Sequence, residues 1–300
     1  MNLLITGAWN AAERERTALG ELGYRVFFLQ NESDPLPLDA GEIDAVVCNG
    51  LFLHHPIGEF TRLKLIQLTS AGLDRVPLDT VGERGIKLCN AAGVYSIPMA
   101  EFALSGVLDL YKRKPAFWKS QKAHEWEKRR DLVELYGKRV LTVGCGSVGR
   151  ACAERFRALG CEVSGVDIVP LESPLYDRIY PVEMIADVLP SFDVVLLSLP
   201  LTKETEGLFG ARLFSRLKDG AVFVNLARGR LADVDALLDN LGRLGGAVLD
   251  VFPEEPLDPS SPLWDEEKVI LTPHNSFIGD GNAERLYRVV YQNLKGFIGK

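Results

Sequence analysis

A glycine-rich turn near the middle of the chain restricts the possible folds more than any other feature. Residues 140–143 are typical of a buried strand, and residues 144–149 follow with the pattern G-x-G-x-x-G. A helical stretch, residues 150–159, comes next, and a second strand, residues 162–167, ends at Asp167. The motif alone is weak evidence. Together, however, the strand, glycine turn, helix, second strand and terminal acid form the dinucleotide-binding fingerprint of a parallel α/β sheet.

Each position of the motif has a physical role in holding a dinucleotide. Gly144 would make the tight turn, Gly146 would let the main chain approach a pyrophosphate, and Gly149 would let helix and strand pack closely. Asp167 would accept hydrogen bonds from the adenosine ribose and repel a 2′-phosphate, which favours NAD over NADP. The other expected cofactor-binding positions of the turn are Ser147 and Val148. The alternative is a glycine-rich turn that binds no ligand.

Composition narrows the class of protein and its partners. A length of 300 residues suggests two domains, and an apolar content of 47% can build their cores. A net charge of -7 with a pI of about 5.3 argues against nucleic acid or an anionic membrane as a partner. The five cysteines form no C-x-x-C pair, and no metal-ligand spacing is present, so we expect a reducing compartment and no metal. Without a signal peptide or a long apolar stretch, the protein is expected to be cytoplasmic.

The remaining sequence also alternates between strands and helices. Strand-like segments are 3–6, 24–29, 45–48, 64–68 and 87–89 before the fingerprint, and 194–199, 221–225, 246–251 and 269–272 after it. With the two fingerprint strands, the second half has six expected parallel strands. Helices are expected at 11–22, 96–111 and 282–298, and the last could return to the first domain. Because only Gly7 follows the first strand, we expect no nucleotide site there.

These elements predict an α/β chain with two doubly wound parallel-sheet domains. A Rossmann NAD-binding domain, residues 95–279, would be inserted into a flavodoxin-like substrate domain formed by residues 1–94 and 280–300.

Three groups of residues that could bind a substrate or transfer a proton follow predicted strands of the second domain. Open α/β sheets bind their ligands at these strand ends. Arg228 offers a planar fork suited to a carboxylate and its neighbouring carbonyl oxygen. A second group contains Asp250, Glu254 and Glu255, and a third contains His274. A carboxylate beside an imidazole favours the protonated ring, which can give a proton to a ketone oxygen as hydride reaches the carbon. Taken singly, each residue could instead be a surface charge, a capping acid or a turn residue.

Motifs in this order resemble the D-isomer-specific 2-hydroxyacid dehydrogenase family, which includes phosphoglycerate dehydrogenase and glyoxylate/hydroxypyruvate reductase. The matching stretches are residues 69–74, 90–101, 144–149, 199–205, 224–229, 249–256 and 271–274. The resemblance spans nearly the whole chain. It departs from the family pattern at Ser198, Tyr95 and 275–276, and the stretch 233–250 is about two residues short.

The resemblance implies a role for each candidate residue. Arg228 would hold the substrate carboxylate and carbonyl, His274 would be the acid/base, and Glu255, rather than Glu254, would be its partner. Asp250 would lie near the nicotinamide. Further cofactor contacts are expected at Pro200 and Ala227, and main-chain N–H groups of Ser70, Ala71 and Gly72 would bind the substrate carboxylate from the other domain.

The preferred hypothesis is therefore an NAD(H)-dependent enzyme that interconverts a small 2-keto acid and its D-2-hydroxy acid, and the family implies a homodimer. Alternatives are a formate- or phosphite-type dehydrogenase on the same scaffold, or an NAD-sensing transcriptional cofactor resembling C-terminal binding protein. Candidate pocket residues are Leu51, Phe52, Tyr95 and Trp126, and several keto acids from glyoxylate to phenylpyruvate stay open as substrates.

Overall fold

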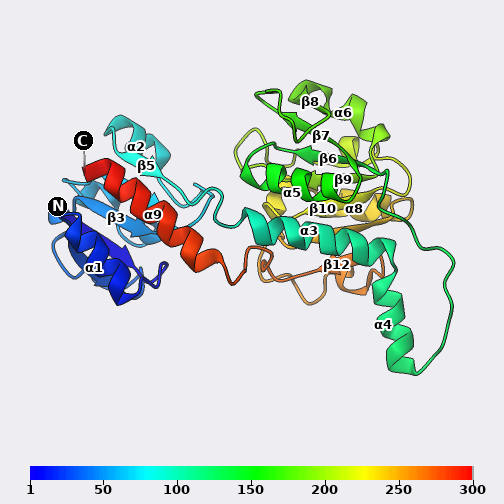
Figure 1. Cartoon of the computed structure of the whole chain (residues 1–300), viewed down its shortest axis with the longest axis horizontal. Helices are drawn as coiled ribbons and strands as arrows, with labels where there is room; N and C mark the ends of the chain where they lie inside the picture. The colour runs from blue at the N-terminus through cyan, green and yellow to red at the C-terminus, as the bar shows by residue number, and fades with distance from the viewer. Residues whose placement is uncertain (299–300) are drawn as a thin grey trace. The chain divides into compact units, whose positions relative to one another are not determined.

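The computed structural model describes residues 1–298, which divide into two compact units (Figure 1). Unit 1 contains Met1–Tyr95 and the segment that begins at Gly279. Unit 2 is Ser96–Ile278. Each unit has its own parallel sheet, as the sequence predicts.

Unit 1 is a five-stranded sheet covered by helices. Its strands are β1 (Asn2–Thr6), β2 (Arg25–Leu29), β3 (Ala45–Cys48), β4 (Leu65–Leu68) and β5 (Lys87–Cys89). Its helices are α1 (Glu13–Glu21), α2 (Leu78–Glu83) and α9 (Asn282–Ile298). The strand order β2-β1-β3-β4-β5, with every pairing parallel, is the flavodoxin-like order, so this prediction is confirmed. Residues of β3 and β4 are buried throughout because helices cover both faces of the sheet.

Helix α9 brings the end of the chain back to the first sheet. Leu286, Val290 and Leu294 recur at a spacing of four, so they share one face of the helix and are buried in the core of unit 1. The hydroxyl of Tyr24 donates to the carbonyl of Leu294 at 2.9 Å, which fixes the helix beside α1 and β2. The amphipathic pattern of this segment therefore predicted its position correctly.

Unit 2 is a seven-stranded parallel sheet. Its strands are β6 (Arg139–Val143), β7 (Glu162–Asp167), β8 (Arg178–Pro181), β9 (Val194–Leu197), β10 (Val222–Asn225), β11 (Gly246–Leu249) and β12 (Val269–Leu271). Its helices are α3 (Ser96–Tyr111), α4 (Lys114–Ala123), α5 (Ser147–Ala158), α6 (Ile185–Val188), α7 (Ala211–Phe214) and α8 (Val234–Leu241). The order β12-β11-β10-β9-β6-β7-β8 extends the Rossmann order by one strand, β12.

The expectation of six strands in this unit is wrong because it omits β8. That strand has only four residues, Arg-Ile-Tyr-Pro, and none of them is fully buried. It lies at the edge of the sheet, where a charged residue and a proline are tolerated. The sequence consequently has no apolar run at this point.

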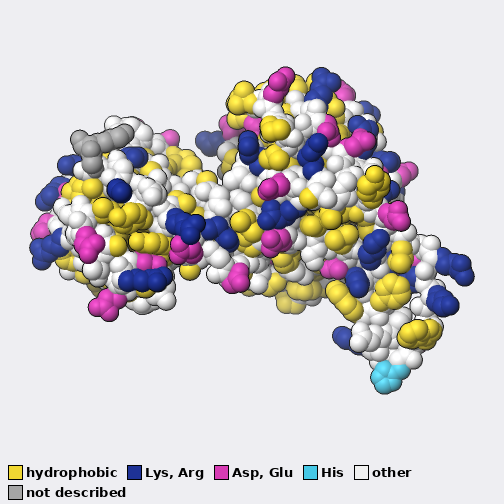
Figure 2. Space-filling view, in the orientation of Figure 1, with side chains coloured by type: hydrophobic (Ala, Val, Ile, Leu, Met, Phe, Trp, Pro, Cys, Tyr) yellow, Lys and Arg dark blue, Asp and Glu magenta, His cyan; other side chains and the backbone are white. Residues whose placement is uncertain are grey.

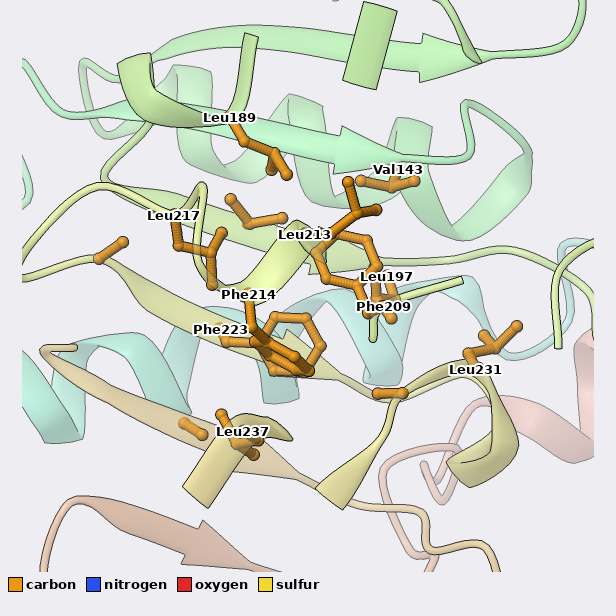
Figure 3. Packing of buried hydrophobic residues seen from close by; sticks show 14 of the residues in the cluster. Val143, Leu189, Leu197, Phe209, Leu213, Phe214, Leu217, Phe223, Leu231 and Leu237 are labelled. Carbon is orange, nitrogen blue, oxygen red and sulfur yellow. The ribbon is translucent and has the colours of Figure 1, made fainter. Parts of the chain in front are cut away.

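Two apolar clusters, one on each face of the sheet, form the core of unit 2. Figure 3 shows one of them, in which Phe209, Phe214 and Phe223 contact one another beneath Leu213 and Leu217. This packing holds the sheet rigid, so the loops at its carboxyl edge start from fixed positions.

Helix α4 projects from the body of unit 2, and the chain after it returns to β6 (Figure 1). Trp118 on this helix is 51% exposed, and Trp126 after it is 95% exposed. Figure 2 shows hydrophobic and basic side chains side by side over this projection. Trp126 is thus a surface residue of unit 2, whereas Leu51, another candidate pocket residue, is fully buried in the core of unit 1.

Candidate active site

The glycine turn joins β6 to α5, and its main chain is accessible at the end next to the helix. Gly144 has φ +98°, and a Cβ there would lie 2.8 Å from the carbonyl oxygen of Ser198. A Cβ on Gly149 would lie 2.1 Å from the carbonyl oxygen of Gly144, so neither position accepts a larger residue. At Gly146, by contrast, a Cβ would meet nothing within 4 Å. Among residues 1–298 nothing requires this glycine, whereas a ligand lying against the main chain would.

Helix α5 starts at Ser147, three positions earlier than the sequence predicts, and therefore within the glycine motif. Its N-cap, Gly146, has no side chain, so no side chain caps the helix. The first N–H groups of a helix have no partner inside it, and the helix dipole adds positive charge at this end. Ser147 and Val148 thus lie where a pyrophosphate would find free donors.

Asp167 connects the end of β7 to the glycine turn. One carboxylate oxygen accepts from the N–H of Cys145 at 2.7 Å, and the other accepts from the N–H of Val169 at 3.0 Å. The hydroxyl of Ser198 donates to the carbonyl of Gly144 at 2.7 Å from the opposite side of the turn. Two strand ends therefore hold the turn, and Ser198, which departs from the family pattern, has a direct structural role.

Asn225 shapes the loop that carries Arg228. The residue is 1% exposed, and its side-chain amide donates to the carbonyl of Arg228 at 3.0 Å and accepts from the N–H of Ala227 at 3.1 Å. The guanidinium of Arg228 donates to the carbonyl of Ala227 at 2.8 Å. The next residue, Gly229, packs directly on the main chain of Phe252, since a Cβ there would lie 1.9 Å from its carbonyl carbon. This contact places the Arg228 loop against the loop that follows β11.

The loop after β11 carries Glu255, and the loop after β12 carries His274. One carboxylate oxygen of Glu255 accepts from the N–H of Phe252 at 3.0 Å, and the other is 2.8 Å from Nδ1 of His274. The ring of Phe277 meets the imidazole edge to face at 5.9 Å between centroids. Side-chain exposures of 38% for His274 and 36% for Glu255 leave the pair accessible. The imidazole is therefore fixed in orientation and reachable by a substrate.

Asp250 is fully buried and organises the His274 loop. Its carboxylate accepts from the hydroxyl of Thr272 at 2.6 Å and from the N–H groups of Asn275 and Ser276 at 2.8 and 2.9 Å. The N–H of His274 in turn donates to the carbonyl of Asp250 at 2.8 Å, and His274 has φ +51°. These contacts give Asp250 a positioning role for the His274 loop, and the position near the nicotinamide that the resemblance implies stays a prediction.

All of these unit 2 residues lie at one edge of one sheet, because parallel strands end on the same side. In sheet order, His274 lies in the loop after β12, Glu255 in the loop after β11 and Arg228 in the loop after β10. Pro200 follows the next strand, β9. β6 and β7 carry the glycine turn and Asp167. The acid/base half and the cofactor half of the candidate site are thus neighbours along this edge.

The predicted carboxylate-binding turn, residues 70–72, lies in unit 1 after β4. Its three carbonyls all accept hydrogen bonds, Ser70 from the N–H of Ala91, Ala71 from the side chain of Asn90, and Gly72 from the hydroxyl of Ser70. No hydrogen bond donated by the three main-chain N–H groups is found among the described residues. A turn whose carbonyl groups already accept hydrogen bonds, and whose N–H groups remain available, is suited to binding an anion.

Within residues 1–298, no helix is long and apolar enough to span a membrane, and no cluster of three or more potential metal ligands is found. The five cysteines are all free thiols. Burial raises the pKa of Cys152 to about 12 and that of Cys161 to about 11.

The fold and this sheet edge define a two-unit α/β protein with a dinucleotide-binding sheet. Residues 104–276 match the family model described as D-isomer specific 2-hydroxyacid dehydrogenase, NAD binding domain. Because the match covers more than half of the chain, the chain belongs to the D-isomer specific 2-hydroxyacid dehydrogenase family.

Known relatives agree with this assignment. The chain is 35% identical over 217 residues to a D-3-phosphoglycerate dehydrogenase of Archaeoglobus fulgidus, covering 71% of this chain but 41% of that protein. It is 31% identical over 249 residues to an (S)-sulfolactate dehydrogenase of Chromohalobacter salexigens, covering 81% and 80% of the two chains. A crystal structure of a D-isomer specific 2-hydroxyacid dehydrogenase family protein from Aeromonas salmonicida has a TM-score of 0.85 at 31% identity, covering 99% and 95%. The chain thus spans about two fifths of the phosphoglycerate dehydrogenase and most of the other two.

Proposed function

We propose that the chain is an NAD(H)-dependent oxidoreductase that interconverts a small 2-keto acid and its D-2-hydroxy acid. The observation that carries this proposal is the His274–Glu255 pair, which lies with Arg228 on the sheet edge that also bears the dinucleotide turn. An acid/base, a carboxylate-binding cation and a cofactor site are the three parts that hydride transfer to a 2-keto acid requires.

The residues present fit a nicotinamide dinucleotide. The open main chain at Gly146 and the uncapped start of α5 suit a pyrophosphate, and Asp167 suits an unmodified ribose. Pro200 and Ala227 follow the next two strands along the same edge. The bound cofactor would supply the hydride. We propose NAD rather than NADP because the carboxylate of Asp167 would repel a 2′-phosphate.

The chain's own residues would bind the keto acid and move the proton. The guanidinium of Arg228 would hold the carboxylate and the keto oxygen in a forked geometry. In unit 1, the main-chain N–H groups of residues 70–72 would donate to a carboxylate. Because Nδ1 of His274 is engaged by Glu255, Nε2 is the nitrogen left for the substrate. Protonated His274 would give its proton to the keto oxygen during reduction, and neutral His274 would remove it during oxidation. Asn225 and Asp250 would keep the two loops in position.

We further propose a cytoplasmic homodimer. The projection formed by α4 and the residues after it exposes Trp118 and Trp126, and exposed aromatic residues of this size favour burial against a second copy. Analytical ultracentrifugation of the wild type and a Trp118→Ser/Trp126→Ser variant would test the dimer, and a monomeric wild type would contradict it.

The function is tested by following NADH oxidation with glyoxylate, hydroxypyruvate, pyruvate, phenylpyruvate and 2-ketoisocaproate, and by determining the configuration of the product. We expect turnover with at least one of them and a D product. Reduction of NAD with formate or phosphite, without keto-acid turnover, would replace the proposal by that alternative. NADH binding without turnover of any of these compounds would favour an NAD-sensing role.

A further inference from the structure

Cys145, in the dinucleotide turn, is joined to the end of β7 by both its main chain and its side chain. Its N–H donates to the carboxylate of Asp167 at 2.7 Å, and its thiol donates to the carbonyl of Val166 at 3.8 Å. Burial raises the pKa of the Cys145 thiol, so the protonated form that can donate is the one present at neutral pH. The turn that would hold a pyrophosphate and the acid that would hold the ribose are therefore coupled through one residue.

Gly165, in the interior of β7, makes room for the sulfur of Cys145. A Cβ on Gly165 would lie 2.2 Å from Sγ, whereas even two carbon atoms at ordinary contact are roughly 3.5–4.0 Å apart. Gly165 has no positive φ, so its main chain would accept a residue with a side chain. Glycine weakens the interior of a strand and often marks the close approach of another group. The sulfur of Cys145 is thus the group that requires glycine at this position.

Together with Gly165, the residues Thr142 and Tyr176 form a niche for this sulfur. Both are buried, and the hydroxyl of Thr142 donates to that of Tyr176 at 3.3 Å. The Thr142 hydroxyl also lies 4.0 Å from the sulfur, and a Cβ on Gly165 would lie 3.3 Å from Cε1 of Tyr176. Buried and hydrogen-bonded neighbours leave the sulfur little space beside its present position. A group that displaces the sulfur therefore acts on the turn.

We infer that Cys145 and Gly165 form a size-matched pair that holds the dinucleotide turn at the correct distance from Asp167, so that Cys145 is a positioning residue for the cofactor. This inference rests on the dinucleotide site of the proposed function, and all of its residues belong to unit 2. A side chain at residue 165 pushes the sulfur, and with it the turn, away from β7. The N–H of Cys145 then loses its contact with Asp167, so the pyrophosphate donors and the ribose acceptor no longer match one cofactor.

Moving the bulk from one partner to the other tests the pairing. Gly165→Ala should raise the Kd for NADH about tenfold. The double variant Gly165→Ala/Cys145→Ala lacks the sulfur, so its Kd should return close to the wild-type value. ADP-ribose contains the pyrophosphate and the ribose without the nicotinamide, so its Kd should change by the same factor. In Gly165→Ala the loss should appear in the KM for NADH rather than in kcat, because Arg228, Glu255 and His274 lie on other loops.

Gly106→Ala is the matched control, because it overpacks the apolar cluster that Cys145 also contacts, but from another part of unit 2. A Cβ on Gly106 would lie 2.7 Å from Cγ1 of Val248 on β11, and β10 and β9 separate β11 from β6. This variant should lower the thermal midpoint without changing the Kd for NADH.

An unchanged Kd in folded Gly165→Ala, no recovery in the double variant, or an equal rise of the Kd in Gly106→Ala would overturn the inference. Should Gly165→Ala fail to fold, Cys145→Val enlarges the same contact from the side of the turn, and a wild-type Kd in that folded variant overturns the inference equally. A wild-type protein that binds neither NADH nor ADP-ribose would instead contradict the proposed function, and this inference with it.

Discussion

Replacing Gly229 by alanine should separate catalysis from cofactor binding. A Cβ at this position would lie 1.9 Å from the carbonyl carbon of Phe252, 2.1 Å from its oxygen and 2.4 Å from its Cα. These are main-chain atoms of the loop that carries Glu255, so no side-chain rotation can relieve the overlap. Carbon atoms at ordinary contact are roughly 3.5–4.0 Å apart. The Arg228 loop and the Glu255 loop must therefore move apart by more than 1 Å.

The size of the effect follows from that displacement. Overpacking typically reduces stability by about 1–3 kcal/mol, and for a unit of this size each kcal/mol lowers Tm by roughly 2–4 °C. A misplacement of about 1 Å in a catalytic group can lower activity on the order of 100-fold. The glycine turn and Asp167 belong to β6 and β7, which are separated from β10 by β9. Of the proposed cofactor contacts only Ala227 lies in the Arg228 loop, so NADH affinity should fall far less than turnover.

The assay compares kcat/KM for the best keto acid, the Kd for NADH and Tm in Gly229→Ala and in Gly242→Ala. Gly242 ends α8 in a right-handed helical conformation with nothing within 4 Å of a Cβ, so alanine there should be neutral. We expect a loss of about 100-fold in kcat/KM for Gly229→Ala only. Wild-type turnover in a folded Gly229→Ala protein would refute the proposed coupling of the two loops.

Three further predictions concern the cofactor, the substrate carboxylate and the thiols. Arg228→Lys keeps the charge but loses the fork, so keto-acid kcat/KM should collapse while the Kd for NADH is retained; normal turnover would remove Arg228 from the mechanism. Wild-type enzyme should prefer NADH to NADPH, and Asp167→Ala should lose that preference. The same variant should bind both cofactors more weakly, because the N–H of Cys145 loses its hydrogen-bond acceptor. Equal wild-type efficiency with NADPH would contradict this prediction. Burial raises the pKa of Cys152 to about 12 and that of Cys161 to about 11, so both thiols are protonated at pH 7. They should therefore react slowly with Ellman's reagent until the protein is unfolded. Rapid reaction of all five thiols in the native state would contradict this prediction.

The sequence predicted the fold well where a physical signal is local. Strands such as β3 and β9 are buried on both faces and consist of uninterrupted apolar residues, and α9 has a regular apolar stripe. β8 carries no such signal, because an edge strand needs no apolar run. The start of α5 within the glycine motif was also not predicted, because glycine is a poor helix former.

The candidate site was predictable only in part. The resemblance pointed to the neighbouring loops that carry Arg228, Glu255 and His274. It did not indicate that Asp250 is enclosed by the His274 loop, since its three donors come from residues 272–276 after folding. The close approach of Cys145 to Gly165 joins two segments that are separate in the sequence, so no local pattern could indicate it.

The rates of keto-acid reduction and hydroxy-acid oxidation in two variants test the central claim, that His274 transfers the proton with Glu255 as its partner. Glu255→Gln keeps the size of the side chain but removes the carboxylate that lies 2.8 Å from Nδ1 of His274. Without that carboxylate the imidazole is less well oriented for proton transfer, so kcat should fall in both directions while the Kd for NADH is retained. His274→Ala should depress both reactions by about 10²–10⁴-fold with NADH binding intact. Wild-type kcat in Glu255→Gln, or near-normal turnover in His274→Ala, would contradict the account.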